Sequence, residues 1–460
     1  MTPLDLTRRK FIGNCCAAVG ATGILSALAQ LRVIGALAAD ASSGSPYQAL
    51  VCIFLYGGND SNNVIIPYDN ADYATYAAQR TALAIPQASL LPITPKTYSD
   101  GRQYALHPSL PEVQALFAQG QLAFMANTGT LTYPTTLTQY NSGTANLPPQ
   151  LFSHADQQVQ WQSSVPDQPF QTGWGGRLAD MVNALNGNSS ISMSISVAGE
   201  NSFQVGNVVS QYAVSPTGAV MLSGTTGGTI NPIRYTNQLD LLSQQESNLF
   251  QAAFSGLTSA AISDASLLTS VLSNSTTLKT VFPATSLGTQ LQMIAKLISA
   301  GPSLGLNRQI FFASLGGFDT HTVELAAQAP LLVQLSQALN AFYNATVELN
   351  VANQVTAFTA SDFNRTYNTN GNGADHGWGS HHMIMGGAVA GGNIYGKMPS
   401  LELGGPDDTG RGRWIPSTSV DQYSATLASW FGVSASNLPV VLPNIGRFAT
   451  ANLGFMKAAT

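Results

Sequence analysis

Three short apolar segments, each followed at once by glycine or serine and then an acid, most constrain how this chain can fold. They cover residues 49–56 (ALVCIFLY), 308–315 (RQIFFASL) and 354–360 (QVTAFTA). Uninterrupted apolar runs of this length are typical of strands buried on both faces, as in parallel sheets. We therefore predict a doubly wound α/β fold: a largely parallel central sheet with helices on both faces.

The acids that follow these segments are Asp60, Asp319 and Asp362. In open α/β sheets, ligands bind at the carboxyl ends of the strands. We therefore expect the three carboxylates to gather at one edge of the sheet. Asp60 alone, after Gly57-Gly58, could equally be a turn residue.

Apolar residues at three-to-four spacing predict helices from Leu239 to about Leu278, over Ser286–Ala300, and from Glu324 to about Leu349. Pro330 is expected to break the last of these in its first part. The region of about residues 190–235 is rich in Gly, Ser and Thr with short β-like pieces, and is predicted to be a small β-rich elaboration.

The N-terminus has the pattern of a targeting segment. Residues 7–12 (TRRKFI) form a twin-arginine motif, a weakly apolar run covers Gly13–Leu31, and Ala36-Leu37-Ala38 offers a cleavage site. We predict a signal peptide over residues 1–38, recognised by the twin-arginine translocase, and a periplasmic or secreted mature protein with no stable membrane span. A polar tether (39–47) and a single domain (48–460) follow.

Charge is sparse, with 18 Lys and Arg against 23 Asp and Glu among 460 residues. This balance leaves no basic face for nucleic acid, so we expect no nucleic-acid partner. Cleavage after Ala38 would leave Cys52 as the only thiol, which excludes an intramolecular disulfide. Its apolar surroundings predict a core residue.

Ser361–Met383 (SDFNRTYNTNGNGADHGWGSHHM) carries three of the six histidines. Its Gly and Asn content predicts a loop, and loops on a rigid scaffold often hold functional side chains. Mixed carboxylate and imidazole donors suit Zn²⁺ or Mn²⁺, and their number allows one or two ions. A polar loop with capping or core histidines is the alternative. The candidate ligands are Asp60, Asp319, His321, Asp362, Asp375, His376 and His381, with His382 next to them.

Ser153 precedes a predicted helix that begins near His154. A hydroxyl there can cap the helix, or it can be a nucleophile whose developing charge the helix end stabilises. His154 is a poor base for Ser153 because adjacent helical residues point apart, but it could reach a metal or a substrate. His107, before a proline, is expected to be structural.

Several motifs together resemble one family of exported bacterial proteins, domain of unknown function 1501. They are LVCIFLYGGNDSNN, LHPSL, SHADQ, GGFDTHT, the histidine-rich loop and STSVDQYSATLASWFG, and they span nearly all of the mature chain. That family is placed in the alkaline phosphatase-like superfamily, with phosphatases and sulfatases. The resemblance implies an alkaline phosphatase-like fold with two metal subsites.

The resemblance also implies roles for single residues. Ser153 is similar to the superfamily's nucleophile at a helix start, and Asp60 to its first-strand metal ligand. Asp319 and His321 are similar to the ligands of one subsite, Asp362 to an acid of the other, and His376 or His381 to the late histidine. Four further residues are expected to contact the ligands or the substrate: Asn59, His154, His382 and Arg365.

Two departures from the superfamily pattern bear on activity. The central pair is Asp319-Thr320-His321, where three residues usually separate the acid from the histidine. Asp362 is followed by Phe363 and not by histidine, although Asp375-His376 could restore that pair.

We expect an exported metal-dependent hydrolase that acts on small phosphate or sulfate esters, with Ser153 or a metal-activated water as nucleophile. A non-catalytic binding or assembly protein that kept the fold and part of the site is the alternative.

Overall fold

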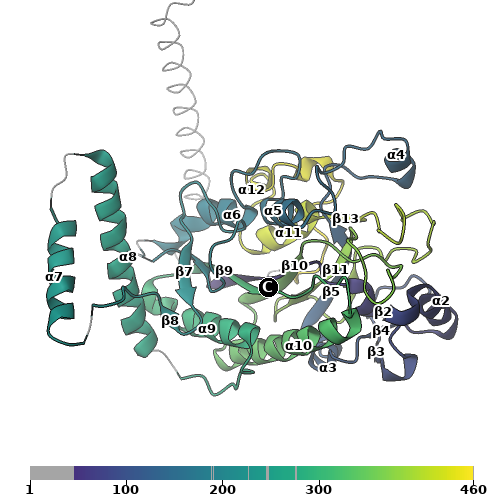
Figure 1. Ribbon diagram of the computed structural model, residues 1–460, viewed down its shortest axis with the longest axis horizontal. Helices are drawn as coiled ribbons and strands as arrows, with labels where there is room; N and C mark the ends of the chain where they lie inside the picture. The colour runs from purple at the N-terminus through teal and green to yellow at the C-terminus, as the bar shows by residue number, and fades with distance from the viewer. Residues whose placement is uncertain are drawn as a thin grey trace, which may run out of the picture.

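The computed structural model describes most of the chain (Figure 1). The predicted signal peptide, and all of the tether before Pro46, lie outside the described residues. These are residues 46–187, 189, 191–225, 227–244, 248–274 and 277–458.

The three apolar segments are neighbouring parallel strands at the centre of the sheet. β1 (Gln48–Leu55) lies between β9 (Arg308–Leu315) and β10 (Val355–Ser361), and Leu55 is aligned with both Leu315 and Ser361. The loops that follow the three strands therefore start at one edge, as predicted. This register decides where the polar side chains of those loops can meet.

The remaining strands extend the sheet on both sides, in the order β12-β5-β11-β10-β1-β9-β6-β7-β8. β11 runs antiparallel to both β10 and β5, so the sheet is mostly but not wholly parallel. The bounds are β5 (Leu122–Gly129), β6 (Ser194–Ser196), β7 (Tyr212–Ser215), β8 (Gly218–Ala219), β11 (Ser380–Met385), β12 (Ile394–Tyr395) and β13 (Thr418–Ser419), which pairs with β5.

Helices cover both faces of this sheet (Figure 1). One layer contains α3 (Pro111–Ala118), α9 (Ser286–Ala300) and α10 (Glu324–Glu348). The other contains α5 (His154–Ser163), α6 (Trp174–Val182), α11 (Val420–Trp430) and α12 (Leu438–Val441). The predicted fold class, mixed α/β with a largely parallel sheet between helices, is confirmed.

Smaller elements lie at the two ends of the sheet. A second sheet, which lies beside α2 (Asn70–Arg80), consists of β2 (Ile65–Pro67), β4 (Tyr104–Leu106) and β3 (Leu91–Ile93). A short helix, α4 (Leu137–Asn141), is separate from this sheet. At the other end, α7 (Ile230–Leu242) and α8 (Leu249–Ser273) form a helical pair. Among the described residues, no helix combines the length and apolar character that a membrane crossing requires.

Three sequence-based boundaries differ from the structure. α10 runs unbroken through Pro330, because its buried leucines hold it against α9 and α3 despite the lost backbone donor. The helix predicted from Leu239 is divided between α7 and α8. The histidine-rich loop ends sooner than predicted, because residues 380–385 (SHHMIM) pair with β5 and β10 as strand β11.

The core between the sheet and α6 is aromatic. Trp174 of α6 packs on Phe203 and Phe358 with ring centroids 4.7 and 5.6 Å apart, and Phe203 also meets Phe312 of β9. Fully burying each such side chain contributes about 1.5–3 kcal/mol. Cys52 of β1 is buried in the same core, and burial raises the pKa of its thiol well above the usual value, as expected of a packing residue.

A buried ion cluster joins the first loop to α2 and α10. The Arg80 guanidinium forms an ion pair with Asp60 and lies 3.2 Å from Glu324, and all three side chains are fully buried. Burial, together with the charge of Asp60, raises the pKa of Glu324 from 4.5 to about 9. In this cluster Glu324 is therefore protonated at neutral pH, and Arg80 pairs with Asp60.

We predict that Arg80→Met lowers the free energy of unfolding by about 3–5 kcal/mol, because it leaves Asp60 buried without a cation. Denaturant unfolding at pH 7 measures this change. Arg102→Met is the control, because Arg102 is partly exposed, lies 3.8–4.0 Å from its acids, and otherwise donates to the Pro399 and Ser400 carbonyls at 2.8 and 3.0 Å. That control should cost about 1–2 kcal/mol, and equal losses in the two variants would contradict the assignment.

We also predict that Glu324 makes stability fall as pH rises. The unfolded chain releases this proton near pH 4.5 and the folded chain only near pH 9, so the stabilisation is complete below pH 4.5 and is lost as pH approaches 9. Glu324→Gln should flatten the decline in unfolding free energy over this window. A wild-type pH profile that the variant leaves unchanged would contradict the proton assignment.

Candidate metal centre

Four side chains from three parts of the chain converge at the carboxyl edge of the sheet. Asp319 and His321 follow β9, His154 is the first residue of α5, and His376 lies in the loop between β10 and β11. One ligand atom from each lies within 4.8 Å of the others. Asp319, His321 and His376 were predicted as ligands, and His154 only as a neighbour.

The distances within this group fit a single small cation. Asp319 Oδ1 lies 3.4 Å from His154 Nε2, 3.2 Å from His321 Nε2 and 3.9 Å from His376 Nε2. The Nε2 atoms of His321 and His376 are 2.8 Å apart. A tetrahedral ion with bonds of about 2.0–2.1 Å keeps its ligand atoms roughly 3.3 Å apart, close to the spacing found here.

Each of the three imidazoles is oriented by an acceptor at its other nitrogen. His154 Nδ1 lies 2.7 Å from Asp362 Oδ2, His376 Nδ1 lies 2.6 Å from the Phe152 carbonyl, and His321 Nδ1 lies 3.2 Å from Asp375 Oδ1. With the proton on Nδ1, each Nε2 turns a lone pair toward the common centre. Metal-binding histidines in proteins are held in this manner.

The Nε2 atom of His154 indicates that this group binds a cation or a hydrogen-bond donor. His154 Nε2 is buried and has no hydrogen-bond partner in the described part of the chain. A buried nitrogen lone pair without a partner costs free energy unless a cation or a donor meets it. Three imidazoles and one carboxylate form a donor set suited to Zn²⁺ or Mn²⁺. The residues therefore fit one divalent transition-metal ion.

Asp362 lies behind the four candidate ligands and not among them. Its fully buried carboxylate accepts hydrogen bonds from Gln158 Nε2 at 2.7 Å and from the Gly57 amide at 3.1 Å, besides its contact with His154. Gln158 is one helical turn after His154, so the two reach Asp362 from one face of α5. The predicted ligand is thus the residue that orients His154. Sequence analysis missed Gln158, although its spacing of four from His154 was a usable signal.

Arg365 fixes the position of the Asp319 carboxylate through a hydrogen bond. Its buried guanidinium donates to Asp319 Oδ1 at 2.6 Å and to the Phe318 carbonyl at 3.1 Å. Burial acts to raise the pKa of Asp319, but the hydrogen bond and charge of Arg365 outweigh it and keep that pKa below its usual value. Arg365 therefore keeps Asp319 ionised and fixed, as its predicted place beside the ligands suggested.

Asp375 and two arginines form the rim of the site. Asp375 forms an ion pair with Arg411 and accepts a hydrogen bond from Asn370. Burial acts to raise the pKa of Asp375, but these two contacts outweigh it and lower the pKa below its usual value. Arg413 Nε donates to the His376 carbonyl at 2.9 Å, and its guanidinium lies 4.6 Å from the centre of the Phe152 ring. Asp375, predicted as a ligand, therefore orients His321, and the rim is cationic.

Ser153 directly precedes His154 in the chain but does not cap the helix that begins there. The Ser153 hydroxyl donates to Asp156 Oδ2 at 2.6 Å, and it makes no bond to the backbone of α5. The capping alternative raised by the sequence is not observed. Phe152, just before it, adopts a left-handed backbone conformation with φ of 71°, a strained geometry that often marks functional sites.

The other predicted site residues lie outside the group of four. Asp60 is engaged by Arg80, and Asn59 accepts a bond from Gln328 at 3.1 Å. His381 Nδ1 accepts from the Asn127 amide at 3.0 Å, and burial lowers the pKa of His381 to about 4.

His382, the next residue, packs between Trp161 and Tyr423, and burial lowers its pKa to about 3. His381 and His382 are strand residues of β11 and are neutral. His107, expected to be structural, is also buried, and its Nδ1 accepts from the Ser109 amide at 3.0 Å.

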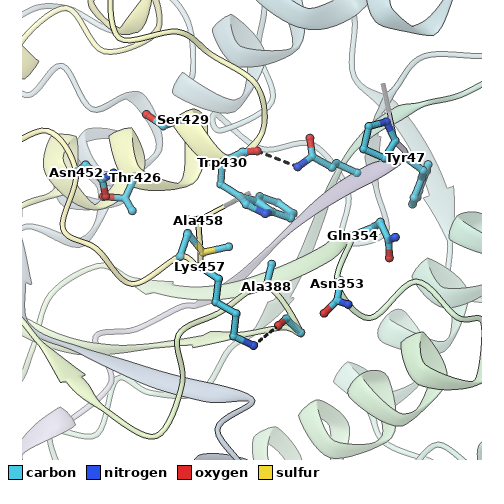
Figure 2. Close-up of a pocket in the computed structure, with 14 residues that line it drawn as sticks. Tyr47, Asn353, Gln354, Ala388, Thr426, Ser429, Trp430, Asn452, Lys457 and Ala458 are labelled. Carbon is cyan, nitrogen blue, oxygen red and sulfur yellow. Dashed lines mark hydrogen bonds between the residues drawn. The ribbon is translucent and has the colours of Figure 1, made fainter. Parts of the chain in front are cut away.

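A cavity of about 750 Å³ lies at the opposite edge of the sheet, and Figure 2 shows residues that line it. It is lined by residues at the amino ends of β1 and β10, such as Gln48 and Gln354, together with Trp430 and Lys457. None of the four converging residues lines it. The candidate metal centre and this cavity are therefore separate features.

A family model described as "Protein of unknown function (DUF1501)" matches residues 47–409. The chain belongs to this family. The resemblance seen in the sequence motifs is thereby confirmed. No match was found among curated proteins.

Several solved structures are similar to this DUF1501 chain at low identity. They include the PsFucS1 sulfatase from Pseudoalteromonas sp. (9% identity, 93% of this chain and 76% of that chain, TM-score 0.37). The C-terminal periplasmic domain of EcEptC from Escherichia coli matches at 10% identity (88% of each chain, TM-score 0.35). A mutant of the alkaline phosphatase PafA also matches at 10% (70% and 64%, TM-score 0.31).

We predict that Asp362→Asn weakens binding of Zn²⁺ about 10–100-fold, because the charge that orients His154 is lost. Asp60→Asn is the matched control: Asp60 is also a buried aspartate just past a neighbouring strand, but it contacts none of the three imidazoles. Competition with a metal indicator measures both affinities, and thermal melting checks the fold. If the two variants lost Zn²⁺ affinity equally, the assignment of the four ligands would be contradicted.

Proposed function

We propose that this DUF1501 protein is an exported metal-dependent hydrolase of small phosphate or sulfate esters, which holds one divalent ion. The observation that carries the proposal is the convergence of three oriented Nε2 atoms with the Asp319 carboxylate. Ser153 directly precedes His154, one of the four. Asp319 and His321 are about half exposed, so a substrate can reach the group. The site is a rigid one on a sheet edge, which suits catalysis.

The residues divide the chemistry as follows. His154, Asp319, His321 and His376 would hold the ion, which would supply Lewis-acid chemistry toward an oxygen of the ester. The Ser153 hydroxyl attacks the phosphorus or sulfur atom, the bond to the ester alcohol breaks, and Asp156, which already accepts the hydrogen bond of Ser153, takes the proton and passes it to the departing alcohol. Water then cleaves the seryl ester, which releases phosphate or sulfate and restores the Ser153 hydroxyl. The positive end of the α5 dipole lies at Ser153 and favours the negative charge that develops there.

The rim favours an anionic substrate. Arg411 and Arg413 place two guanidinium groups around His376 and Asp375, and guanidinium groups pair well with phosphate and sulfate oxygens. Arg365, by contrast, is buried and committed to Asp319, so it positions the ligand rather than the substrate.

Export by the twin-arginine translocase completes the proposal. Residues 7–12 carry the twin-arginine motif, and that route transfers folded proteins. We propose that the ion is loaded before export and that the mature protein acts in the periplasm or outside the cell.

One observation favours a second function, a non-catalytic binding or assembly protein. Phe363, which stands where the superfamily has a histidine, packs its ring against His154 and His376 with centroids 4.7 and 4.6 Å apart. An apolar ring there offers no ligand atom for a second ion. A protein that binds this ion for structure alone would keep the four ligands but would not need Ser153 or Asp156.

We predict turnover of an aryl phosphate or an aryl sulfate by the metal-loaded protein. Asp156→Asn should lower kcat/KM about 10²–10⁴-fold by removing the proton acceptor, and Ser153→Ala at least as much, with metal content unchanged. Asp167→Asn is the control, because Asp167 pairs with Arg447 away from the group. Full metal binding without turnover of either ester would replace the hydrolase with the binding protein.

A further inference from the structure

The helical pair α7–α8 carries nine of the twenty exposed large apolar side chains in the described part of the chain. It stands at the end of the molecule, beside the sheet and not over it (Figure 1). Ile230, Ile233 and Leu241 of α7 and Phe250, Phe254 and Leu257 of α8 are between 60% and 87% exposed. Large apolar side chains that are exposed together in this way mark an interaction site on a protein.

These side chains form regular stripes. Phe250, Phe254 and Leu257 are spaced i, i+4, i+7 and share one face of α8. The C-terminal half of α8 is anchored to the body of the protein through the buried Ala265 and Leu268. The stripe therefore belongs to the half of α8 that projects with α7.

The charges of this region argue against a lipid surface as partner. Residues 220–273 contain one cation, Arg234, and three acids, Asp240, Glu246 and Asp264. Helices that lie on membranes are rich in Lys and Arg on their polar face. The flanking residues here are mostly Ser, Thr, Asn and Gln, which suits a protein partner.

The exposed face of α7 is self-complementary. At about 100° per residue, Ile230, Ile233, Arg234, Asp240 and Leu241 all fall within roughly 120° of one face, with Asn237 at its centre. Two copies of α7 that run antiparallel about a two-fold axis at Asn237 place Ile233 opposite Leu241 of the other copy. The same register places Arg234 opposite Asp240.

We propose that the α7–α8 pair is a homodimer interface, in which α7 packs antiparallel on α7 of a second copy and the α8 stripes lie alongside. A two-fold contact requires a surface that complements itself, and the hydrophobic and charged pairs meet that requirement. Covering the six apolar side chains in both copies removes on the order of 1,200 Å² from water. This is the lower end of the range for specific, stable interfaces.

The test is the oligomeric state of the mature chain, residues 39–460, by light scattering after size exclusion and by sedimentation equilibrium. The wild type is a dimer at roughly 100 µM. Arg234→Asp weakens dimerisation at least about tenfold by placing two acids opposite each other. The double variant Arg234→Asp, Asp240→Arg restores it, because the pair is only exchanged between copies.

A second set of variants tests the apolar contact. Ile233→Ser with Leu241→Ser abolishes the dimer, whereas Val281→Ser, which removes an even more exposed apolar side chain outside the pair, does not. Circular dichroism confirms the fold of each variant. A monomeric wild type, with or without binding to anionic vesicles, would overturn the proposal. A dimer that survives the Ile233 and Leu241 changes, or charge reversal without rescue, would overturn it as well.

Discussion

The contact between His154 and the buried Asp362 carboxylate connects every part of the candidate site. It joins the start of α5 to the carboxyl end of β10, and it turns His154 Nε2 toward Asp319 at the end of β9. Gln158 and the Gly57 amide complete the bonds to Asp362, so β1 takes part too. The site forms only if these three strands end in register, and their pairing ensures this.

The parts that could be predicted from the sequence follow from local pattern. Continuous apolar runs marked β1, β9 and β10, and Asp319 with His321 followed β9 directly, so their place at the edge was determined by the strand itself. His376 was predicted from the density of histidines in its loop. In each case the backbone path alone was enough to bring the residue near the site.

The features of the candidate site that could not be predicted depend on the orientation of a side chain and on the residues that it contacts. Asp60 and Asp362 both end a strand, but Asp60 meets Arg80 and Asp362 meets His154. No local pattern distinguishes the two. His381 and His382 follow His376 closely, yet their segment pairs as β11 and buries them. Consecutive strand residues face opposite sides of a sheet, so the two could not both join the site.

The central claim is that three imidazoles and one carboxylate bind one ion, and X-ray absorption at the metal edge of the Zn²⁺-loaded protein tests it most directly. We expect about three imidazole nitrogens and one oxygen at roughly 2.0–2.1 Å, with one imidazole fewer in His154→Ala and no change in His107→Ala. A shell composed only of oxygens, or a spectrum that His154→Ala leaves unchanged, would contradict the account.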